Sequence, residues 1–282
     1  MAPDFGVRSM TADLRRVLVV RPSATGDFAA AGWRQPQGAA LLREHDGFVA
    51  LLDRLGVDVT VAAAPDGLVD ACYPYDPVFV TGAGAVELQM AKPVRRHEPS
   101  FLAAEVEKAG VPVVGRLVGD ARADGGDMCW LDETTLAVGR GYRTNAPAHA
   151  QLAEILGPQG VVVERADLPH HLGAAYVLHL MSVVSPVTAD LAVVFEPLAP
   201  VPLLELLAER GYRTVTCDPA EFDAQGCNVL AVRPGVVVMA DSAPRTRSIL
   251  ERAGMEVHAY PATELNKGDG GPTCLTRPLL RR

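Results

Sequence analysis

A unit of strand, strand, helix and strand recurs about every 50 residues, and it restricts the fold of this chain more than any other feature. Short β-branched runs predict the strands, and apolar residues at helical spacing predict the helices. Each predicted helix stops at a glycine, which suits a left-handed C-cap. These glycines are Gly56, Gly110, Gly157, Gly211 and Gly254.

The units follow one another along the chain, and its two ends together complete one of them. The predicted elements are a strand at 16–20, a helix at 37–55 and a strand at 57–61; strands at 77–80, 84–88 and 111–114 with a helix at 99–109; strands at 128–131, 134–138 and 161–164 with a helix at 146–156; strands at 177–184, 191–195 and 212–216 with a helix at 200–210; strands at 228–232, 235–239 and 255–259 with a helix at 244–253; and a last strand that begins at Cys274. We therefore predict a closed α/β ring of about five modules. No Pro/Ser-rich linker divides it, so we expect one domain over residues 1–282.

Composition argues against several classes of partner. A net charge of −8 and an aromatic content of 5% give no electrostatic case for nucleic acid. No run approaches the roughly 20 apolar residues that cross a bilayer, and the N-terminus lacks the features of a signal peptide. Five scattered cysteines, none paired at zinc-site spacing, favour a reducing cytoplasm without a structural zinc, and we predict no cofactor. The sequence leaves the oligomeric state open, a homodimer included.

The stretch Asn266-Lys-Gly-Asp-Gly-Gly-Pro-Thr-Cys274 is the strongest candidate for chemistry. Its three glycines and its proline make a loop that can take positive φ and approach a ligand closely. A thiol at the end of such a loop can act as a nucleophile. The loop alone favours a small buried apolar side chain, since free cysteine is among the most buried residue types. Other residues must therefore decide whether Cys274 is a nucleophile or a buried core residue.

A nucleophilic thiol requires a base, and His179 in an apolar predicted strand is the best candidate. A histidine there needs a purpose or a buried hydrogen-bond partner, and a satisfied core histidine is the alternative. His170 and His171 are adjacent in a Pro/Gly loop, so we interpret them as loop residues and not as a metal pair. The Gly/Ala-rich segment 21–36 is interpreted as a surface loop, with a mobile cover over a site as the alternative.

Several acids and arginines form a set around predicted strands. Asp124-Gly-Gly-Asp127 repeats the design of the cysteine loop, and its first carboxylate either belongs to a turn or orients an imidazolium. Asp70 and Asp76 precede another strand, and Arg95 follows them. With Arg143, which could hold a carboxylate bidentately, this set suits a zwitterionic amino acid with a cationic side chain.

Together these motifs resemble those of the dimethylarginine dimethylaminohydrolases. The resemblance rests on Asp124-Gly-Gly-Asp, Gly139-x-x-x-Arg-Thr-Asn, Leu178-His-Leu-x-Ser and Glu264-Leu-x-Lys-x-Asp-Gly-x-x-Thr-Cys, in this order over almost the whole chain. That family belongs to the guanidino-modifying enzymes, or penteins, with arginine deiminases and amidinotransferases. The resemblance implies a five-module α/β propeller of ββαβ repeats around a central active site. It also implies a thiol hydrolase that converts N-methylated arginines to citrulline and an alkylamine.

The resemblance also implies residue roles. Cys274 resembles the nucleophile, His179 the general acid/base and Asp124 the active-site carboxylate, so that the thiolate attacks the guanidinium carbon and a thiouronium intermediate is hydrolysed. The residues that match substrate-binding positions are Asp76 and Asp70 among the acids and Arg95 and Arg143 for the amino-acid end. Because an anionic site raises a cysteine pKa, we expect the thiolate to form when the cationic substrate arrives.

Two positions depart from the family patterns. Tyr75 stands where the dimethylaminohydrolases usually have a glutamate, which leaves the side-chain specificity open. Met181 stands where deiminases and amidinotransferases have the aspartate of His-x-Asp, which argues against plain deiminase or transferase activity. The alternatives are a hydrolase or amidinotransferase acting on arginine or another guanidino or ureido amino acid, and a non-catalytic ring protein that binds an amino acid.

Overall fold

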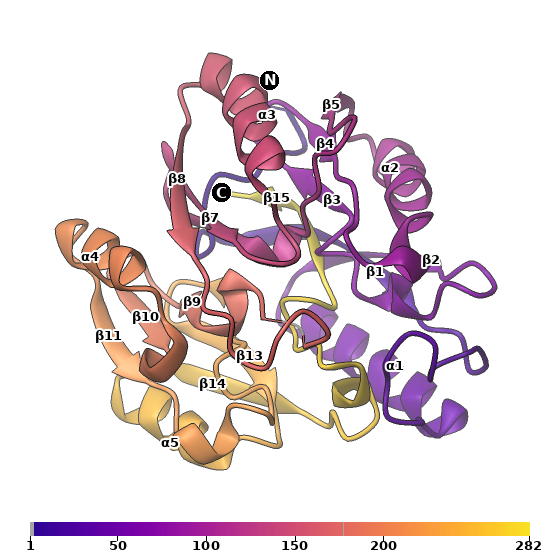
Figure 1. Ribbon diagram of the computed structural model, residues 1–282. Helices are drawn as coiled ribbons and strands as arrows, with labels where there is room; N and C mark the ends of the chain where they lie inside the picture. Colours follow the sequence, from indigo (N-terminus) through magenta and orange to yellow (C-terminus); the bar gives the residue numbers. More distant parts are fainter. Residues whose placement is uncertain (1–2, 177) are drawn as a thin grey trace.

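Five three-stranded sheets surround a common centre in the computed structural model, which describes residues 3–176 and 178–282 (Figure 1). Helices α1 to α5 lie on the outside and follow one another around the ring in chain order (Figure 1). This arrangement confirms the predicted α/β ring of five modules. That the chain is one domain stays a prediction.

The bounds of the elements match the predicted units closely. The sheets are β15 (Arg277–Arg281), β1 (Leu14–Arg21) and β2 (Asp58–Ala63); β3 (Val78–Val80), β4 (Ala85–Glu87) and β5 (Val113–Arg116); β6 (Met128–Asp132), β7 (Thr135–Arg140) and β8 (Val162–Asp167); β9 (Val184–Pro186), β10 (Leu191–Val194) and β11 (Arg213–Thr216); and β12 (Leu230–Arg233), β13 (Val236–Ala240) and β14 (Glu256–Tyr260). The helices are α1 (Gly38–Arg54), α2 (Glu98–Lys108), α3 (Ala146–Leu156), α4 (Val201–Glu209) and α5 (Pro244–Arg252).

All five modules share one strand arrangement. The middle strand pairs antiparallel with the first strand and parallel with the third. A parallel pair needs a long crossover, and the helix of each module supplies it. The first strands β3, β9 and β15 are buried along their whole lengths, whereas the third strands β5 and β11 are largely exposed. The first strands therefore form the inner side of the ring.

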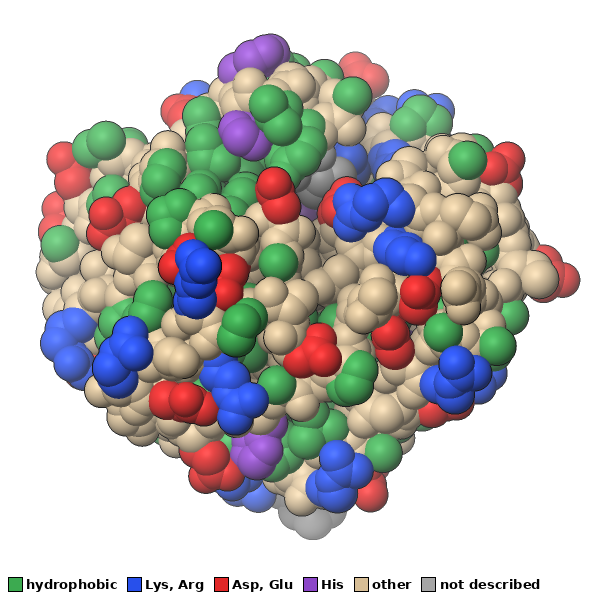
Figure 2. Space-filling view, turned by 90° about the horizontal axis from the view of Figure 1, so that it is seen from below, with side chains coloured by type: hydrophobic (Ala, Val, Ile, Leu, Met, Phe, Trp, Pro, Cys, Tyr) green, Lys and Arg blue, Asp and Glu red, His purple; other side chains and the backbone are tan. Residues whose placement is uncertain are grey.

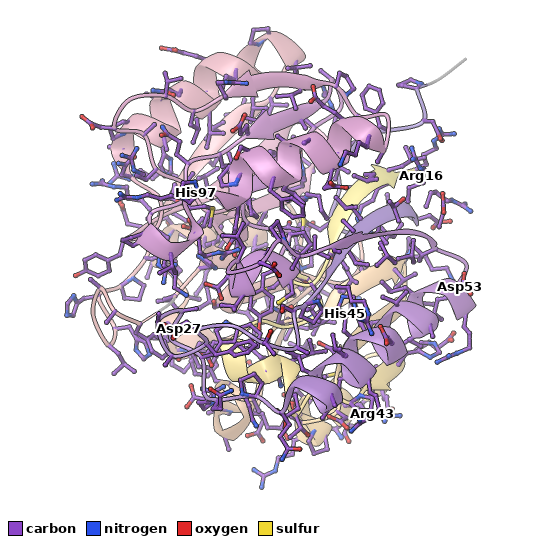
Figure 3. The ribbon with its side chains drawn as sticks, turned by 90° about the vertical axis from the view of Figure 1, so that its right-hand side faces the viewer. Arg16, Asp27, Arg43, His45, Asp53 and His97 are labelled. Atoms are coloured by element: carbon purple, nitrogen blue, oxygen red, sulfur yellow. The ribbon has the colours of Figure 1, made fainter. Side chains whose placement is uncertain are left out.

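Helix α1 shows how the outer layer is attached to the sheets. Leu41 and Phe48 on one face are fully buried. His45 lies on the same face, and in the described part of the chain neither ring nitrogen has a partner, so burial lowers its pKa to about 4. Figure 3 shows His45 directed into the molecule, while Arg43 and Asp53 of the same helix lie on the outside.

Two predicted strand positions are wrong. In the segment predicted as a strand at 177–184, Val177 lies outside the described residues, and 180–182 form a short 3₁₀ turn before β9. His179 precedes this turn and is not inside a strand, because a buried turn and a buried strand have the same apolar composition. Cys274 lies in a turn closed by the bond from Leu275 N to Gly271 O, 3.1 Å, and β15 begins only at Arg277.

Segment 21–36 packs against the cysteine loop. Phe28 and Trp33 are buried, and Arg34 N donates to Lys267 O over 3.0 Å. On the surface, Figure 2 shows acidic and basic side chains interspersed over one face. Within residues 3–176 and 178–282 no helix is long and apolar enough to span a membrane. The cytoplasmic location stays a prediction.

One predicted helix stop also needs correction. Four of the five glycines have positive φ, but Gly157 is helical with φ −52° and leads into a short 3₁₀ turn. The left-handed residue is Gly160, with φ +73°. Because Pro158 follows Gly157, the chain makes this extra turn before it reverses.

Replacing Gly160 with alanine tests this assignment. Gly160→Ala should lower the free energy of unfolding in urea by about 1–2 kcal/mol, since a Cβ is strained at positive φ. The control is Gly157→Ala, where the gain in helix propensity is offset by the following proline and we expect a change below about 0.5 kcal/mol. No atom lies within 4 Å of an added Cβ at either position, so crowding does not enter. A larger loss at Gly157 would contradict the assignment.

Candidate active site

At least one polar side chain stands just before the first strand of every module. Asp76 precedes β3, Asp124 precedes β6, His179 precedes β9, Asn228 precedes β12 and Cys274 precedes β15. Because the first strands form the inner side of the ring, these side chains gather at its centre. The sequence predicted four of the five as site residues.

Asp124 links two of the predicted site residues. Its Oδ2 lies 3.1 Å from Nε2 of His179 and 3.3 Å from Nη1 of Arg143. Its Oδ1 is buried and has no hydrogen-bond partner among the described residues. Burial raises the pKa of Asp124, but the bond from His179 and the nearby positive charges outweigh it and hold the pKa below its usual range. The carboxylate therefore stays ionised, with one oxygen available to a ligand.

The imidazole of His179 is surrounded by acids. Burial lowers its pKa, but the carboxylates of Asp76, Asp124 and Asp127 raise it more, so that the net pKa is above the usual value. His179 is therefore protonated to a higher pH than an exposed histidine. An imidazolium in this position can donate a proton to a leaving group.

The two glycines of Asp124-Gly-Gly-Asp127 allow this close approach. A Cβ on Gly125 would overlap the carbonyl oxygen of Tyr75, and a Cβ on Gly126 would overlap the ring of His179. Gly126 N also donates to Asp76 Oδ1 over 2.9 Å. The loop thus fixes Asp124, in the module of β6, against His179, in the module of β9.

Arg95 binds carboxylates from three positions. Its Nη1 lies 2.6 Å from Asp76 Oδ2, its Nη2 lies 2.8 Å from Glu98 Oε2, and its Nε lies 3.9 Å from Asp70 Oδ2. The guanidinium is buried, and these charges raise its pKa well above the usual value although burial opposes them. Its donors are occupied by protein groups, which fits the positioning of Asp76 better than the predicted contact with a substrate.

Asp70 is bound by other side chains. Its Oδ1 accepts from Trp33 Nε1 over 2.6 Å, and its Oδ2 accepts from Lys92 Nζ over 2.6 Å. Lys92 also donates to the carbonyl of Ala31. Asp70 therefore attaches segment 21–36 to the ring. Its predicted role in substrate binding stays a prediction.

Cys274 is partly buried beside this acidic group. Its sulfur accepts from Asn228 Nδ2 over 3.3 Å, and its carbonyl accepts from Tyr75 N over 3.3 Å. Burial and the charge of Asp76 raise the thiol pKa to about 11, while hydrogen bonds from Gly271 and Asn228 oppose the rise. Because Asp76 acts on both the thiol and the imidazole, the three groups share one electrostatic environment.

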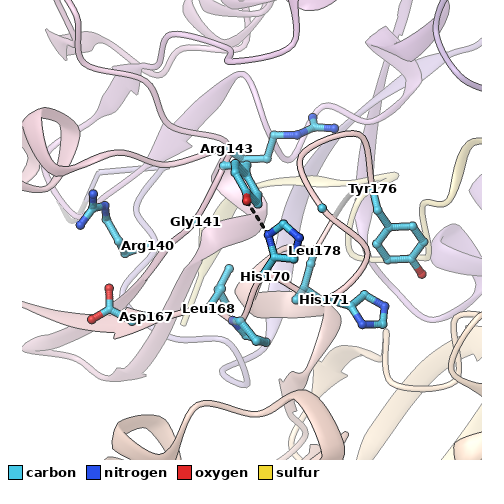
Figure 4. Close-up of a pocket in the computed structure, with 12 residues that line it drawn as sticks. Arg140, Gly141, Arg143, Asp167, Leu168, His170, His171, Tyr176 and Leu178 are labelled. Atoms are coloured by element: carbon cyan, nitrogen blue, oxygen red, sulfur yellow. Dashed lines mark hydrogen bonds between the residues drawn. The ribbon is translucent and has the colours of Figure 1, made fainter.

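Two cavities lie near these residues, and one of them is lined by a predicted site residue. One of about 300 Å³ is lined by Arg143 and by the loop that carries His170 and His171 (Figure 4). In it Tyr142 Oη lies 2.6 Å from His170 Nδ1. A second of about 350 Å³ is lined by Asn228, and Tyr176 borders both cavities. In the described part of the chain no group of three or more His, Cys, Asp or Glu side chains is arranged to hold a metal ion.

The two departures from the family patterns add no carboxylate to the centre. Tyr75 directs its hydroxyl to Met128 O, 3.4 Å away, and its ring lies 4.3 Å from the guanidinium carbon of Arg277. Met181 is buried in the apolar core. The acids that act on the imidazole are therefore Asp76, Asp124 and Asp127, and Asp76 also acts on the thiol.

Sequence comparison relates the chain to arginine deiminases. The sequence model of the arginine deiminase family matches residues 182–281, a range that includes Cys274 but not His179. An arginine deiminase of Listeria welshimeri is 26% identical over 256 residues, covering 77% of this chain and 63% of the deiminase. The chain thus spans less than two thirds of the length of that relative.

Structural comparison shows the fold. Dimethylarginine dimethylaminohydrolase of Pseudomonas aeruginosa, solved as a cysteine-to-serine variant with citrulline, has a TM-score of 0.77 at 20% identity over 96% of this chain and 100% of that one. The N-terminal domain of ArgZ, a cyanobacterial arginine dihydrolase bound to its product, has a TM-score of 0.81 at 17% identity over 95% and 98%. The chain thus shares the fold of these two enzymes and has distant sequence similarity to arginine deiminases, with no single member indicated.

Sequence reasoning missed several residues that shape the site. Lys92 and Glu98 pair with Asp70 and Arg95, and an arginine with glutamate three positions later was a usable signal for the second pair. Asn228 was missed because an asparagine before a strand is typical of a turn. Its position in its module, equivalent to that of Asp76, was the signal that could have found it.

The pKa of Cys274 gives a test. Alkylation by iodoacetamide should be slow at pH 7 and should rise about tenfold per pH unit up to pH 10, since the thiolate is the reacting form and the pKa is about 11. The other four cysteines are buried, and Cys274→Ser measures their contribution. A rate that reaches its plateau by pH 8 would show a thiolate that is already formed and would contradict the description of the site.

Proposed function

We propose that this chain is a cysteine hydrolase that acts on the guanidinium carbon of an arginine-type amino acid, with N-methylated arginine as substrate and citrulline and an alkylamine as products. One observation carries the proposal. Asp124 holds His179 with one oxygen, and its other oxygen is buried with no partner among the described residues, while Asp76 acts on both that imidazole and the thiol of Cys274. A buried, unpaired carboxylate oxygen is costly without a ligand, and a planar cation with several N–H donors suits it.

The proposed reaction uses the thiol and the imidazole in turn. Asp76 and Asp124 bind the guanidinium, and its positive charge lowers the pKa of Cys274 so that the thiolate forms. Sγ attacks the guanidinium carbon, and the carbon–nitrogen bond to the alkylamine breaks as His179 gives that nitrogen a proton. The resulting thiouronium holds the rest of the substrate on Cys274.

Hydrolysis completes the cycle. The neutral His179 takes a proton from water, the oxygen adds to the same carbon, and the carbon–sulfur bond breaks to release citrulline and the thiol. Arg143 reaches Asp124 and also lines the cavity of about 300 Å³, so we assign it to the carboxylate of the amino acid. We assign Arg95 to holding Asp76 in place, because its donors face protein carboxylates.

Unmethylated arginine is the second candidate substrate. Two observations favour it: the sequence similarity is to arginine deiminases, and Tyr75 supplies no acid for a substituted nitrogen. The chemistry at Cys274 and His179 would be the same, with ammonia in place of the alkylamine.

A product assay on three substrates tests the proposal. With asymmetric dimethylarginine, monomethylarginine and arginine in parallel, we expect citrulline together with dimethylamine, methylamine or ammonia, and the highest kcat/KM for a methylated substrate. Cys274→Ser should abolish all three reactions, since the other four cysteines are buried and only Cys274 is partly exposed. Ornithine as the product would indicate transfer or a further hydrolysis, and no product from any of the three would contradict the proposal.

A further inference from the structure

We propose that Asn228 is a further catalytic residue of this site, whose side-chain amide binds the sulfur of Cys274 and directs it toward the substrate. The inference rests on the proposed function, which makes Cys274 the nucleophile. Its starting point is the bond from Nδ2 of the buried Asn228 to Sγ, 3.3 Å long. This bond connects the reacting atom to the module of β12, β13 and β14.

The orientation of this amide is fixed by its second bond. Oδ1 of Asn228 accepts from the backbone N–H of Thr273 over 3.1 Å. A backbone N–H can only donate, so the amide oxygen must face Thr273 and the amide nitrogen must face the sulfur. Asn228 thus holds the cysteine loop at two adjacent residues.

The position of Asn228 in the ring supports the same role. In the other four modules the residues before the first strand are the predicted substrate-binding Asp76 and the predicted catalytic Asp124, His179 and Cys274. Asn228 occupies the equivalent position before β12. With it, every module contributes one polar side chain to the centre.

Neighbouring residues hold Asn228 rigidly. Asn228 N donates to Gln225 O over 3.0 Å, and Gln225 has a left-handed backbone with φ +65°. On the other side, a Cβ on Gly271 would overlap the side chain of Asn228. The close contact between the two loops therefore requires a glycine at 271, which explains the second glycine of the Gly270-Gly271 pair.

The amide also changes the chemistry of the sulfur. Burial and Asp76 raise the pKa of Cys274 to about 11, and the bond from Asn228 opposes them because an N–H donor favours the thiolate. The bond strengthens when the sulfur becomes negative and weakens when the sulfur is bound to carbon. Asn228 therefore favours the thiolate both before attack and as the leaving group in hydrolysis.

Asn228→Asp is the direct test, because it keeps the acceptor for Thr273 N and replaces the donor to sulfur with a negative oxygen. We expect the rate of iodoacetamide alkylation at pH 9 to fall about tenfold or more, because the thiolate loses a charge-assisted hydrogen bond. The pH at which the alkylation rate rises should move upward. In the product assay, kcat should fall while KM changes by less than about twofold. Asn228→Ala removes the donor without adding charge and should show the same direction if the aspartate variant does not fold.

Gln225→Glu is the matched control, since it adds a negative charge to the same turn and keeps the amide of Asn228. Its alkylation profile should stay within about twofold of the wild type, because Gln225 is half-buried at the edge of a cavity, where solvent screens a charge, and it is not among the groups that act on the thiol. Wild-type alkylation in both folded Asn228 variants would overturn the inference. Alkylation needs no substrate, so it tests the role of Asn228 even if the chain hydrolyses no guanidine. Failure of the proposed function and failure of the role of Asn228 are therefore distinguishable.

Discussion

The pairing of β15 with β1 is the interaction on which the arrangement of the site depends. It joins the two ends of the chain, with Leu14 opposite Arg281 and Leu18 opposite Arg277. Cys274 lies just before β15, so this pairing brings the thiol to the centre, far in sequence from Asp76, Asp124 and His179. The entropy of closing so long a loop grows only slowly with its length, and the buried pairing of β15 with β1 opposes it. Closure of the ring is thus also assembly of the site.

The electrostatics of the centre follow from burial. Carboxylates that lose water require charged or hydrogen-bonding partners, and Arg95, Arg143 and His179 supply them. The pairing is incomplete, because Asp124 Oδ1 has no partner among the described residues. Asp76 raises the pKa values of both the imidazole and the thiol, and Asp124 and Asp127 add to the effect on the imidazole. An acidic centre of this kind suits the cation that the proposed function requires, and a bound cation would lower the pKa values of the thiol and of the imidazole.

The sequence predicts the architecture well because local sequence patterns define each repeat unit. Apolar periodicity and terminal glycines define each helix, and only Gly157 misleads, since Pro158 extends the turn to Gly160. The site is predicted through loops in which glycines stand beside an acid or a thiol. Positions that depend on tertiary contacts are harder to predict from the sequence. Arg95 looks free in the sequence but is enclosed by carboxylates, and His179 looks like a strand residue but precedes a turn. Asn228 becomes visible only when the modules are superimposed.

The central claim is that the sulfur of Cys274, the ring of His179 and the two acids act on one planar cation. Mass spectrometry of a His179→Gly variant incubated with dimethylarginine tests it most directly. Without the imidazole to activate water, the account predicts an adduct on Cys274 with the mass of the substrate less one molecule of amine, stable enough to map to the peptide that contains residue 274. A variant that turns over normally, or an adduct on another residue, would contradict it.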